Sequence, residues 1–381
     1  MLKMTLRRRA TVAGSIAVLL ASSASLAAAQ TVCDQQSFQS RPIFLGTSGG
    51  NINSIGQNFC CGGTLGALVQ DRIGRRSHKA AAQYILSNNH VLGRVNRGSP
   101  GEPIIQPGLV DQSVSCDQNV GDTVATLSRK IPIRFGGPGN AADAAIAQVV
   151  SGDVSDQILN IGPISGQVIS RARAALGLPV QKMGEATCLT TGSVVAINVT
   201  GIIKYPALCN ETPGTATFVH QILVTPGSFA SEGDSGSLLV TTESCPRAIG
   251  LVFAGATNGS GVLANPIGPI LKQLKVQMVA GCGGGAASAA QTSTSANAPV
   301  MASKSVSPSE ATAAPAVAAQ PSDSDVDDAI EIQERHHDDL MKVPGAVGTG
   351  VGLGRHPGST EIEVYLSKDT TQARAALPAQ V

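Results

Sequence analysis

The chain has 381 residues, with 27 lysines and arginines against 26 acidic residues. Its net charge of +1 excludes a protein built mainly to bind nucleic acid through phosphate contacts. A hydrophobic fraction of 42% with only 14% charged residues excludes a disordered chain, and the length allows two or three domains. The 43 glycines and 21 prolines make turns frequent, which favours a many-stranded β protein over a helical bundle.

Residues 1–29 are interpreted as a secretory signal peptide rather than as part of the fold. Lys3 and Arg7–Arg9 form a positive start, Val12–Leu20 is apolar, and small residues end at Ala27–Ala29. The alternatives are a membrane anchor, for which the apolar run is short, and a twin-arginine signal, which the neighbouring residues fit poorly. The sequence therefore predicts a secreted or periplasmic protein with no membrane span in the mature chain.

An N-terminal segment, 30–56, precedes a continuous folded region at 57–282, in which short β-like runs alternate with turn residues. The expected strands are Thr64–Gln70, Gln83–Leu86, Thr123–Leu127, Ala144–Val150, Ser193–Val199, Val219–Val224, Ser237–Val240 and Ala248–Phe253. One stretch near the end of the region, Pro269–Val279, has helical periodicity. Many short strands with few helices predict antiparallel sandwiches or barrels.

The composition changes at Gly283, and residues 283–325 are rich in Ala, Ser, Pro, Thr and Gln. Such a segment has too few apolar residues to fold, which predicts a linker. Residues 326–381 follow as a small module with a helix at Val326–Met341 and strands at Val347–Leu353 and Ile362–Leu366. Within that helix, the run His336–Asp339 is interpreted as a solvated face rather than as a metal site.

All eight cysteines lie after the predicted signal peptide, at Cys33, Cys60, Cys61, Cys116, Cys188, Cys209, Cys245 and Cys282. An even number of cysteines in an exported protein predicts disulfides, and the wide spacings make the rival interpretation, a zinc site, the weaker one. The pairing stays open. Two pairings are expected: Cys188 with Cys209 across a hairpin, and Cys245 with Cys282 near the end of the folded region.

Three motifs contain the residue types of nucleophilic catalysis. They are Tyr84–Leu92 with His90 at a strand end, Asn140–Val149 with Asp143, and Ser231–Val240 with Ser235 in a Gly-rich turn. Taken alone, each has a structural explanation: a satisfied histidine, a turn cap, or a common turn sequence. The order His, Asp, Ser at separations of 53 and 92 residues favours catalysis over these explanations.

The chemistry needs these three residue types together. A serine hydroxyl is a poor nucleophile until a base takes its proton, and that base needs a carboxylate to orient it. The glycines beside Ser235 let the backbone turn sharply, so that the N–H groups of Gly233 and Ser235 point at one place. Two such donors form an oxyanion hole, which stabilises the charge that develops on an attacked carbonyl.

These motifs resemble those of the chymotrypsin-fold (trypsin-like) serine peptidases, and within them the bacterial and plant narrow-leaf-type peptidases. The resemblance extends from about Cys61 to Val276. It rests on Gly63–Val69, Leu86–Leu92, Ile105–Gly108, Asp143–Ile146, Val180–Gly184, Gly233–Ser237, Gly250–Gly255 and Ala264–Ile267. It implies an all-β fold of two six-stranded antiparallel β-barrels, in which His90 and Asp143 come from the first barrel and Ser235 from the second.

The chain departs from this family in three places. No Cys follows His90, so the partner that Cys61 would have in animal trypsins is absent. Glu185 begins the run Glu185–Gly192, where the family usually has Arg-Thr-Thr-Gly. The Ile-Val-Gly-Gly terminus of animal zymogens is also missing, so that Asp234 has to find another partner than a freed amine. The oxyanion hole is therefore expected to form without N-terminal cleavage.

The resemblance also places the specificity pocket. Phe229, six residues before the nucleophile, stands at the base of the S1 pocket, and Phe253, Ala254 and Gly255 form its wall and the substrate edge. An uncharged floor argues against Arg or Lys at P1 and favours a small or apolar side chain, because a buried cation without a partner is costly.

The leading hypothesis is an exported serine-type endopeptidase, a hydrolase that acts on protein or peptide substrates. One alternative is a catalytically weak trypsin-like protein that uses the C-terminal module to bind a partner. The other is an esterase with the same triad, although no lipase-type Gly-x-Ser-x-Gly elbow is present. No cofactor, metal or nucleic-acid partner is predicted, and the sequence leaves the oligomeric state open.

Overall fold

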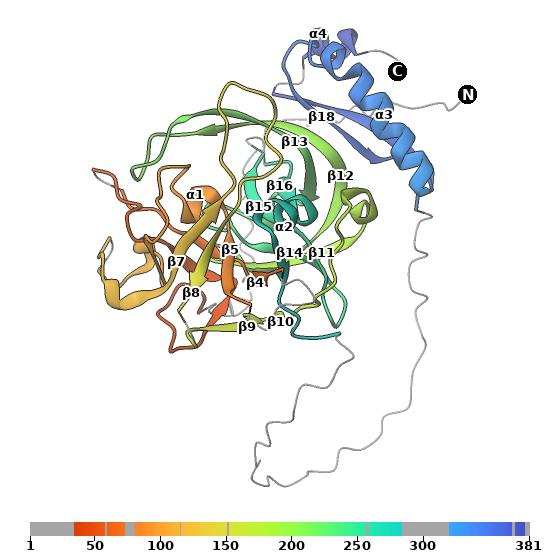
Figure 1. Cartoon of the computed structure of the whole chain (residues 1–381). Helices are drawn as coiled ribbons and strands as arrows, with labels where there is room; N and C mark the ends of the chain where they lie inside the picture. Colours follow the sequence, from red (N-terminus) through yellow and green to blue (C-terminus); the bar gives the residue numbers. More distant parts are fainter. Residues whose placement is uncertain are drawn as a thin grey trace, which may run out of the picture.

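The structure is a computed structural model that describes residues 34–57, 59–72, 81–114, 116–150, 152–256, 259–283, 320–367 and 370–377. The predicted signal peptide lies outside the described residues, as does most of the predicted linker. Two antiparallel sheets account for most of the strands, and Figure 1 shows them side by side in the body of the molecule.

The first sheet closes into a six-stranded barrel. Its strands are β2 (Thr47–Asn51), β3 (Gly63–Leu65), β4 (Ala67–Asp71), β5 (Gln83–Ser87), β6 (Pro103–Ile105), β7 (Thr123–Lys130) and β8 (Ala145–Val149). They are hydrogen-bonded in the order β4-β5-β8-β7-β6-β2-β3. Since only Gly66 separates β3 from β4, these two segments act as one bent strand that closes the ring.

The second sheet closes in the same way. It contains β11 (Pro179–Gly184), β12 (Cys188–Tyr205), β13 (Gly214–Thr225), β14 (Leu238–Thr241), β15 (Ala248–Gly255) and β16 (Val262–Pro266). The order is β11-β14-β15-β16-β13-β12, and an additional pairing between β11 and β12 completes the ring. The predicted all-β fold with two six-stranded antiparallel barrels is therefore confirmed.

Aliphatic side chains make up most of both cores, and Phe218, Phe229 and Phe253 join them in the second barrel. In β5, Tyr84, Ile85 and Leu86 are all buried, because one face of the strand points into its barrel and the other lies under neighbouring segments. This explains why the central strands read as continuous apolar runs instead of strict alternation.

Short elements connect and flank the barrels. A three-stranded sheet contains β1 (Ile43–Leu45), β9 (Val154–Ile158) and β10 (Gly162–Pro163). The helices of this region are α1 (Asn89–Leu92) and α2 (Ile267–Leu274), with short 3₁₀ turns at Leu109–Asp111, Val120–Asp122, Ala172–Ala175 and Gly227–Phe229.

The predicted helix at Pro269–Val279 is wrong in its second half. Lys275 has a left-handed backbone (φ +58°) and ends α2, and β17 (Val276–Met278) then pairs antiparallel with β4. A single left-handed residue is enough to turn the chain out of a helix. Pairing with an open strand edge then supplies the hydrogen bonds that a longer helix would have made within itself.

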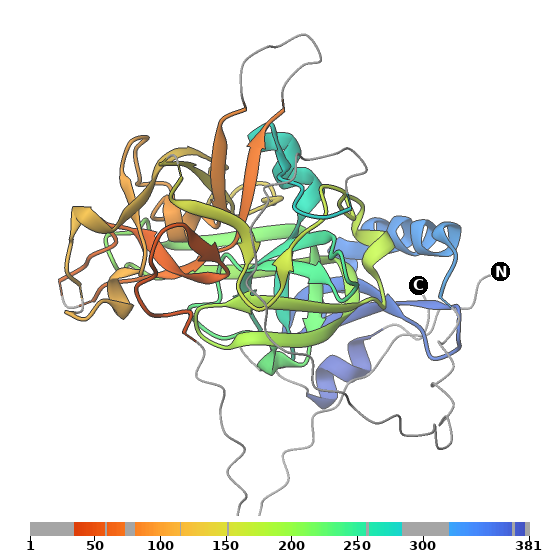
Figure 2. The ribbon, with the colours of Figure 1, turned by 90° about the horizontal axis from the view of Figure 1, so that it is seen from below.

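The C-terminal module continues the sheet of the second barrel. It consists of α3 (Asp323–Leu340), β18 (Ala346–Leu353), β19 (Thr360–Leu366) and α4 (Thr371–Ala376). Strand β18 pairs antiparallel with β12 at residues 196–197, and β19 forms the outer edge. Figure 2 shows α3 and these strands against one side of the second barrel.

Two further observations refine the prediction for this module. Ser322 and Asp325 form a capping box, so that α3 begins three residues before the predicted start at Val326. Val326 and Ala329 of α3 are buried in the same apolar cluster as Ile197 of β12. The module therefore packs on the barrel through a shared core, a contact that its sequence pattern did not predict.

Three disulfides join described cysteines: Cys60–Cys116, Cys61–Cys209 and Cys245–Cys282. The expected pairing of Cys245 with Cys282 is confirmed. The expected pairing of Cys188 with Cys209 is wrong, because Cys209 lies at the far tip of the β12–β13 hairpin and meets Cys61 of the first barrel.

Cys188 is also disulfide-bonded, and the described residues contain no free cysteine. The same part of the chain contains no cluster of His, Cys, Asp and Glu suited to a metal ion. No helix within the described ranges is long and apolar enough to cross a membrane.

Candidate active site

His90 and Asp143 meet at one end of the first barrel. Strand β5 leads directly into α1, whose second residue is His90, and Asp143 stands two residues before β8. The imidazole Nδ1 lies 2.6 Å from Asp143 Oδ2, and the His90 backbone N–H donates to Oδ1 at 3.1 Å. Asn88 and Asn265 fix the Asp143 backbone through its carbonyl (2.7 Å) and its N–H (3.0 Å). The structure therefore holds an imidazole–carboxylate pair in a defined orientation.

Burial and pairing act in opposite directions on the two groups. Burial disfavours the imidazolium, but the fully buried Asp143 carboxylate and its hydrogen bond raise the pKa of His90 above its ordinary value. Burial would likewise raise the pKa of Asp143, yet the facing His90 and the hydrogen bonds from His90 and Tyr205 hold it below its ordinary value. Asp143 thus stays ionised next to a more basic imidazole.

Ser235 lies on the predicted Gly-rich turn, between Gly233 (φ +99°) and Gly236 (φ +97°). Both values are in the left-handed region, which favours glycine. Thr64 of β3 anchors this turn, because its N–H donates to the Ser235 carbonyl (2.8 Å) and its hydroxyl to the Gly233 carbonyl (3.0 Å).

The turn and α1 approach each other at Gly63. A Cβ built on Gly63 would lie 2.6 Å from a methyl group of Val91 and 3.0 Å from the Ser235 carbonyl oxygen. The structure thus brings the Ser235 backbone next to the residue that follows His90. No hydrogen bond joins Ser235 Oγ to the imidazole within the described residues. Among the three predicted catalytic side chains, the hydrogen bonds that are formed are those between His90 and Asp143.

Asp234 finds its partner in Lys182 of β11. The Lys182 ammonium lies 3.2 Å from Asp234 Oδ2, and both side chains are fully buried. Asp234 also accepts hydrogen bonds from the Thr187 hydroxyl (2.6 Å) and from the N–H groups of Ala186, Thr187 and Ser231, at 2.9–3.1 Å. Burial lowers the pKa of Lys182, which Asp234 partly offsets. Asp234 therefore has an internal cation as its charged partner.

Glu185 lies directly behind the turn that bears Ser235. A Cβ added to Gly233 would be 1.8 Å from Glu185 Oε2, so the carboxyl group packs against the Gly233 backbone. Burial, with a smaller contribution from the hydrogen-bonded Asp111 carboxylate, raises the pKa of Glu185 to about 7. Glu185 is therefore a carboxylic acid that folding keeps protonated at mildly acidic pH.

We expect Glu185→Gln to stabilise the protein at pH 8. A carboxyl group with a raised pKa in the folded state stabilises it at low pH, and this contribution is lost as the pH rises from about 4.5 to about 7. Ionisation of Glu185 in the folded protein should lower the free energy of unfolding at pH 8 by about 2–3 kcal/mol. Gln does not ionise, so the variant avoids this loss. Urea unfolding at pH 4.5 and pH 8 measures the difference, with exposed Glu232→Gln as control. Equal pH dependence in both variants would contradict the assignment.

The four predicted specificity residues lie at different depths. The Phe229 ring is 1% exposed in the core of the second barrel, with the Lys182 ammonium 5.9 Å from its centroid. Phe253 is also buried and lies against Phe218, with ring centroids 4.8 Å apart. Ala254 is half-buried, and Gly255 is exposed with open space at its Cβ position. Only the last two face outward.

Several residues of the site had no assigned role in the sequence prediction. Lys182 and Asn265 stand inside motifs that carried the family resemblance, so a signal for them existed. Tyr205 and Glu211 stand outside every motif and reach the site on the β12–β13 hairpin. Burial is the main cause that raises the pKa of Glu211 to about 7, with His90 and Asp143 close enough to act on it electrostatically.

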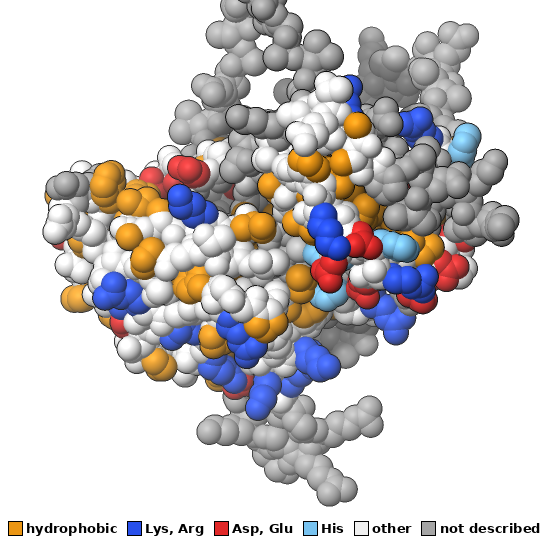
Figure 3. Space-filling view, turned by 90° about the horizontal axis from the view of Figure 1, so that it is seen from above, with side chains coloured by type: hydrophobic (Ala, Val, Ile, Leu, Met, Phe, Trp, Pro, Cys, Tyr) orange, Lys and Arg blue, Asp and Glu red, His pale blue; other side chains and the backbone are white. Residues whose placement is uncertain are grey.

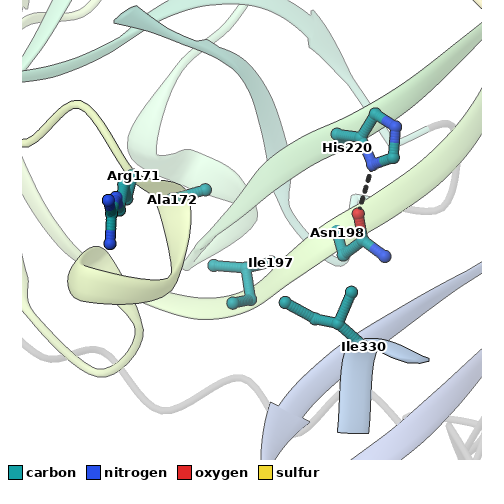
Figure 4. A pocket seen from close by; sticks show the side chains of 6 residues that line it. All are labelled: Arg171, Ala172, Ile197, Asn198, His220 and Ile330. Atoms are coloured by element: carbon teal, nitrogen blue, oxygen red, sulfur yellow. Dashed lines mark hydrogen bonds between the residues drawn. The ribbon is translucent and has the colours of Figure 1, made fainter. Parts of the chain in front are cut away.

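A cavity of about 330 Å³ lies away from these residues, where the second barrel meets α3. The lining residues, labelled in Figure 4, are Arg171, Ala172, Ile197, Asn198, His220 and Ile330. His220 and Asn198 are hydrogen-bonded to each other on the paired strands β13 and β12. None of the predicted site residues belongs to this lining.

The run His336–Asp339 on α3 is partly turned inward. Asp338 and Asp339 are exposed, but His337 Nδ1 lies 2.9 Å from the buried Thr349 hydroxyl of β18. Nearby surface charges pair along the helix, as in Arg335–Glu331 and Lys342–Asp339. Figure 3 shows acidic, basic and histidine side chains side by side on this face of the molecule.

Neither a family model nor a curated protein sequence matches the chain. Among solved structures, the chain is similar to Thermobifida fusca protease A, with 19% identity over 63% of this chain and 99% of that one (TM-score 0.38). It is also similar to a Nocardiopsis protease, with 18% identity over 57% of this chain and 93% of that one (TM-score 0.38). A third similar structure is Cellulomonas bogoriensis chymotrypsin, with 18% identity over 62% of this chain and 98% of that one (TM-score 0.38).

Proposed function

We propose that this protein is an exported serine endopeptidase in which His90, Asp143 and Ser235 form the catalytic triad. The observation that supports it best is the fully buried Asp143, which binds His90 Nδ1 at 2.6 Å beside the turn that bears Ser235. A buried carboxylate is costly unless it is paired. Its placement against an imidazole that is 20% exposed is typical of a catalytic base.

In the proposed mechanism His90 takes the Ser235 hydroxyl proton as Ser235 Oγ bonds to the scissile carbonyl carbon. The N–H groups of Gly233 and Ser235 stabilise the resulting oxyanion. His90 then gives its proton to the leaving amine, the C–N bond breaks, and an acyl-enzyme forms. Water, deprotonated by the same imidazole, releases the acid and regenerates Ser235. Asp143 keeps the imidazole oriented and stabilises its protonated form throughout.

The experiment that tests this function is digestion of a peptide library by the oxidised protein, with cleavage products identified by mass spectrometry. Ser235→Ala serves as the matched control. Cleavage within peptides by the wild type alone supports an endopeptidase. Hydrolysis of ester substrates without any amide cleavage would favour the esterase, and the absence of both, with no labelling by a fluorophosphonate, would favour the binding protein.

We expect the enzyme to prefer small or apolar P1 residues. The predicted pocket floor carries Phe229 instead of a carboxylate, and the Lys182 ammonium 5.9 Å from its ring centroid is a cation already paired with Asp234. An Arg or Lys side chain would therefore be buried without a partner, which should cost about 10²-fold or more in kcat/KM. Matched peptides that differ only in Ala or Arg at P1 measure this ratio. A preference for Arg would show that the floor is misassigned.

The exported location belongs to the same proposal. Disulfides form and persist mainly in oxidising compartments, and the three described here support export. The resemblance to narrow-leaf-type peptidases rests on sequence motifs alone and stays a prediction. Immunodetection of the chain in periplasmic and culture-medium fractions tests the location.

A further inference from the structure

The β12–β13 hairpin extends beyond its own barrel. Strand β13 pairs with β16 only at residues 222–224, whereas β12 and β13 stay paired with each other out to Tyr205 and Gly214. Among the described residues, the outer half of the hairpin therefore pairs with no further strand of the second barrel. In Figure 1 it runs across toward α1, which carries His90.

Several contacts fasten this outer half to the first barrel, among them a disulfide and hydrogen bonds of Arg94 and Asn140. Cys209 at the tip is bonded to Cys61, and the Arg94 guanidinium donates to the Asn210 carbonyl at 3.4 Å. Asn140 pairs with the hairpin through its N–H to the Thr217 carbonyl, at 2.8 Å. Arg94 follows His90 by four residues, and Asn140 precedes Asp143 by three. The hairpin is thus anchored on both sides of the imidazole–carboxylate pair.

Tyr205, the last residue of β12, uses this position to reach Asp143. Its hydroxyl donates to Asp143 Oδ2 at 2.8 Å, the same oxygen that binds His90 Nδ1. The ring is 7% exposed and lies against Phe135 and Phe218, with centroids 5.9 and 6.4 Å away. Burial and the Asp143 charge raise the pKa of Tyr205 well above its ordinary value, so the hydroxyl remains a donor.

The carboxylate of Asp143 accepts three hydrogen bonds from described groups: the His90 backbone N–H, His90 Nδ1 and the Tyr205 hydroxyl. The first two come from His90 itself. Tyr205 is the donor that holds the carboxylate independently of the residue that the carboxylate must orient. A group held in this way keeps its geometry while the imidazole gains and loses a proton.

We propose that Tyr205 is a positioning residue of this site: its hydroxyl, carried across by the anchored hairpin, fixes the Asp143 carboxylate that orients His90. The inference rests on the proposed function, which it deepens. The proposal gives Tyr205 a contact with Asp143 and none with the substrate. Its loss should therefore act on the chemical step and leave substrate binding unchanged.

The test is Tyr205→Phe, which removes one hydroxyl and keeps the buried ring. We expect kcat to fall about 10-fold, the equivalent of one hydrogen bond to a charged group, with KM changed by less than about twofold. The less solvated Asp143 charge should also raise the pKa of His90, seen as an upward shift of its NMR titration and of the acidic limb of kcat/KM. Glu211 on the hairpin, the other charged group that acts on the imidazole, and Arg94, which acts on Glu211, stay unchanged in this variant.

The chain supplies its own matched controls, because it has three tyrosines and the other two also donate to carboxylates. Tyr84 donates to Asp71 at 2.9 Å and Tyr365 to Glu363 at 2.7 Å, both away from the triad. We expect Tyr84→Phe and Tyr365→Phe to keep the wild-type kcat and His90 titration. Thermal unfolding of all three variants checks that each one folds.

Two results would overturn the inference. One is a Tyr205→Phe variant with wild-type kcat and wild-type His90 titration. The other is a loss of kcat accompanied by lower stability and a higher KM but no change in the His90 titration, which would indicate a purely structural role. If the wild type hydrolyses no peptide, the proposed function fails. Comparison of the His90 titration in the wild type and in Tyr205→Phe still decides whether Tyr205 positions the His90–Asp143 pair.

Discussion

Ser235→Ala is expected to lower kcat/KM for peptide hydrolysis about 10⁴-fold or more, and His90→Ala should do the same. Without Ser235 Oγ no acyl-enzyme forms, and without the imidazole nothing takes the hydroxyl proton. Because the triad residues act as a unit, the double variant should be hardly slower than either single one. Steady-state hydrolysis of one library-derived peptide measures all three.

Ser231→Ala provides the matched control for this result. Ser231 is an exposed serine on the same turn, and its contribution to the turn is its backbone N–H, which donates to Asp234 at 2.9 Å and remains in the variant. We expect this variant to keep wild-type activity and fluorophosphonate labelling. Undiminished labelling of Ser235→Ala would show that the nucleophile lies elsewhere.

Lys182→Met is expected to destabilise the protein by about 3–5 kcal/mol and to reduce peptidase activity. Met keeps the length of the side chain but leaves the fully buried Asp234 carboxylate without its cation. The hydroxyl and N–H donors of Thr187 and its neighbours remain, yet hydrogen bonds alone do not replace an opposite charge at 3.2 Å. Urea unfolding monitored by circular dichroism measures the loss.

Two variants separate this explanation from a general effect of losing a lysine. The double change Lys182→Met with Asp234→Asn removes both charges and should recover part of the lost stability, because no buried charge is left unpaired. Lys272→Met on the exposed side of α2 should change stability by about 0.5 kcal/mol or less. A Lys182→Met variant as stable as the wild type would rule out the pair as the support of the Ser235 turn.

Local sequence patterns predicted much of this protein's architecture. The alternation of apolar runs with glycine and proline predicted a many-stranded β protein, and His90, Asp143 and Ser235 stood out because catalytic chemistry requires particular side chains on sharp turns. The left-handed Gly233 and Gly236 show why that pattern was informative, since few other residues adopt such a backbone. The Cys245–Cys282 pairing was also accessible, because both cysteines lie close to the end of the folded region.

Contacts between distant segments were decided only by the tertiary structure. Tyr205 meets Asp143 across 62 residues, and Cys61 meets Cys209 across 148, because the β12–β13 hairpin crosses from one barrel to the other. No local pattern encodes where a hairpin tip comes to lie. The same reason explains why the second half of the predicted helix at 269–279 is wrong. Val276–Met278 forms a strand there because it pairs with the open edge of β4. Side-chain type and local backbone preference are properties of the sequence itself, whereas partners exist only once the two barrels have closed and packed.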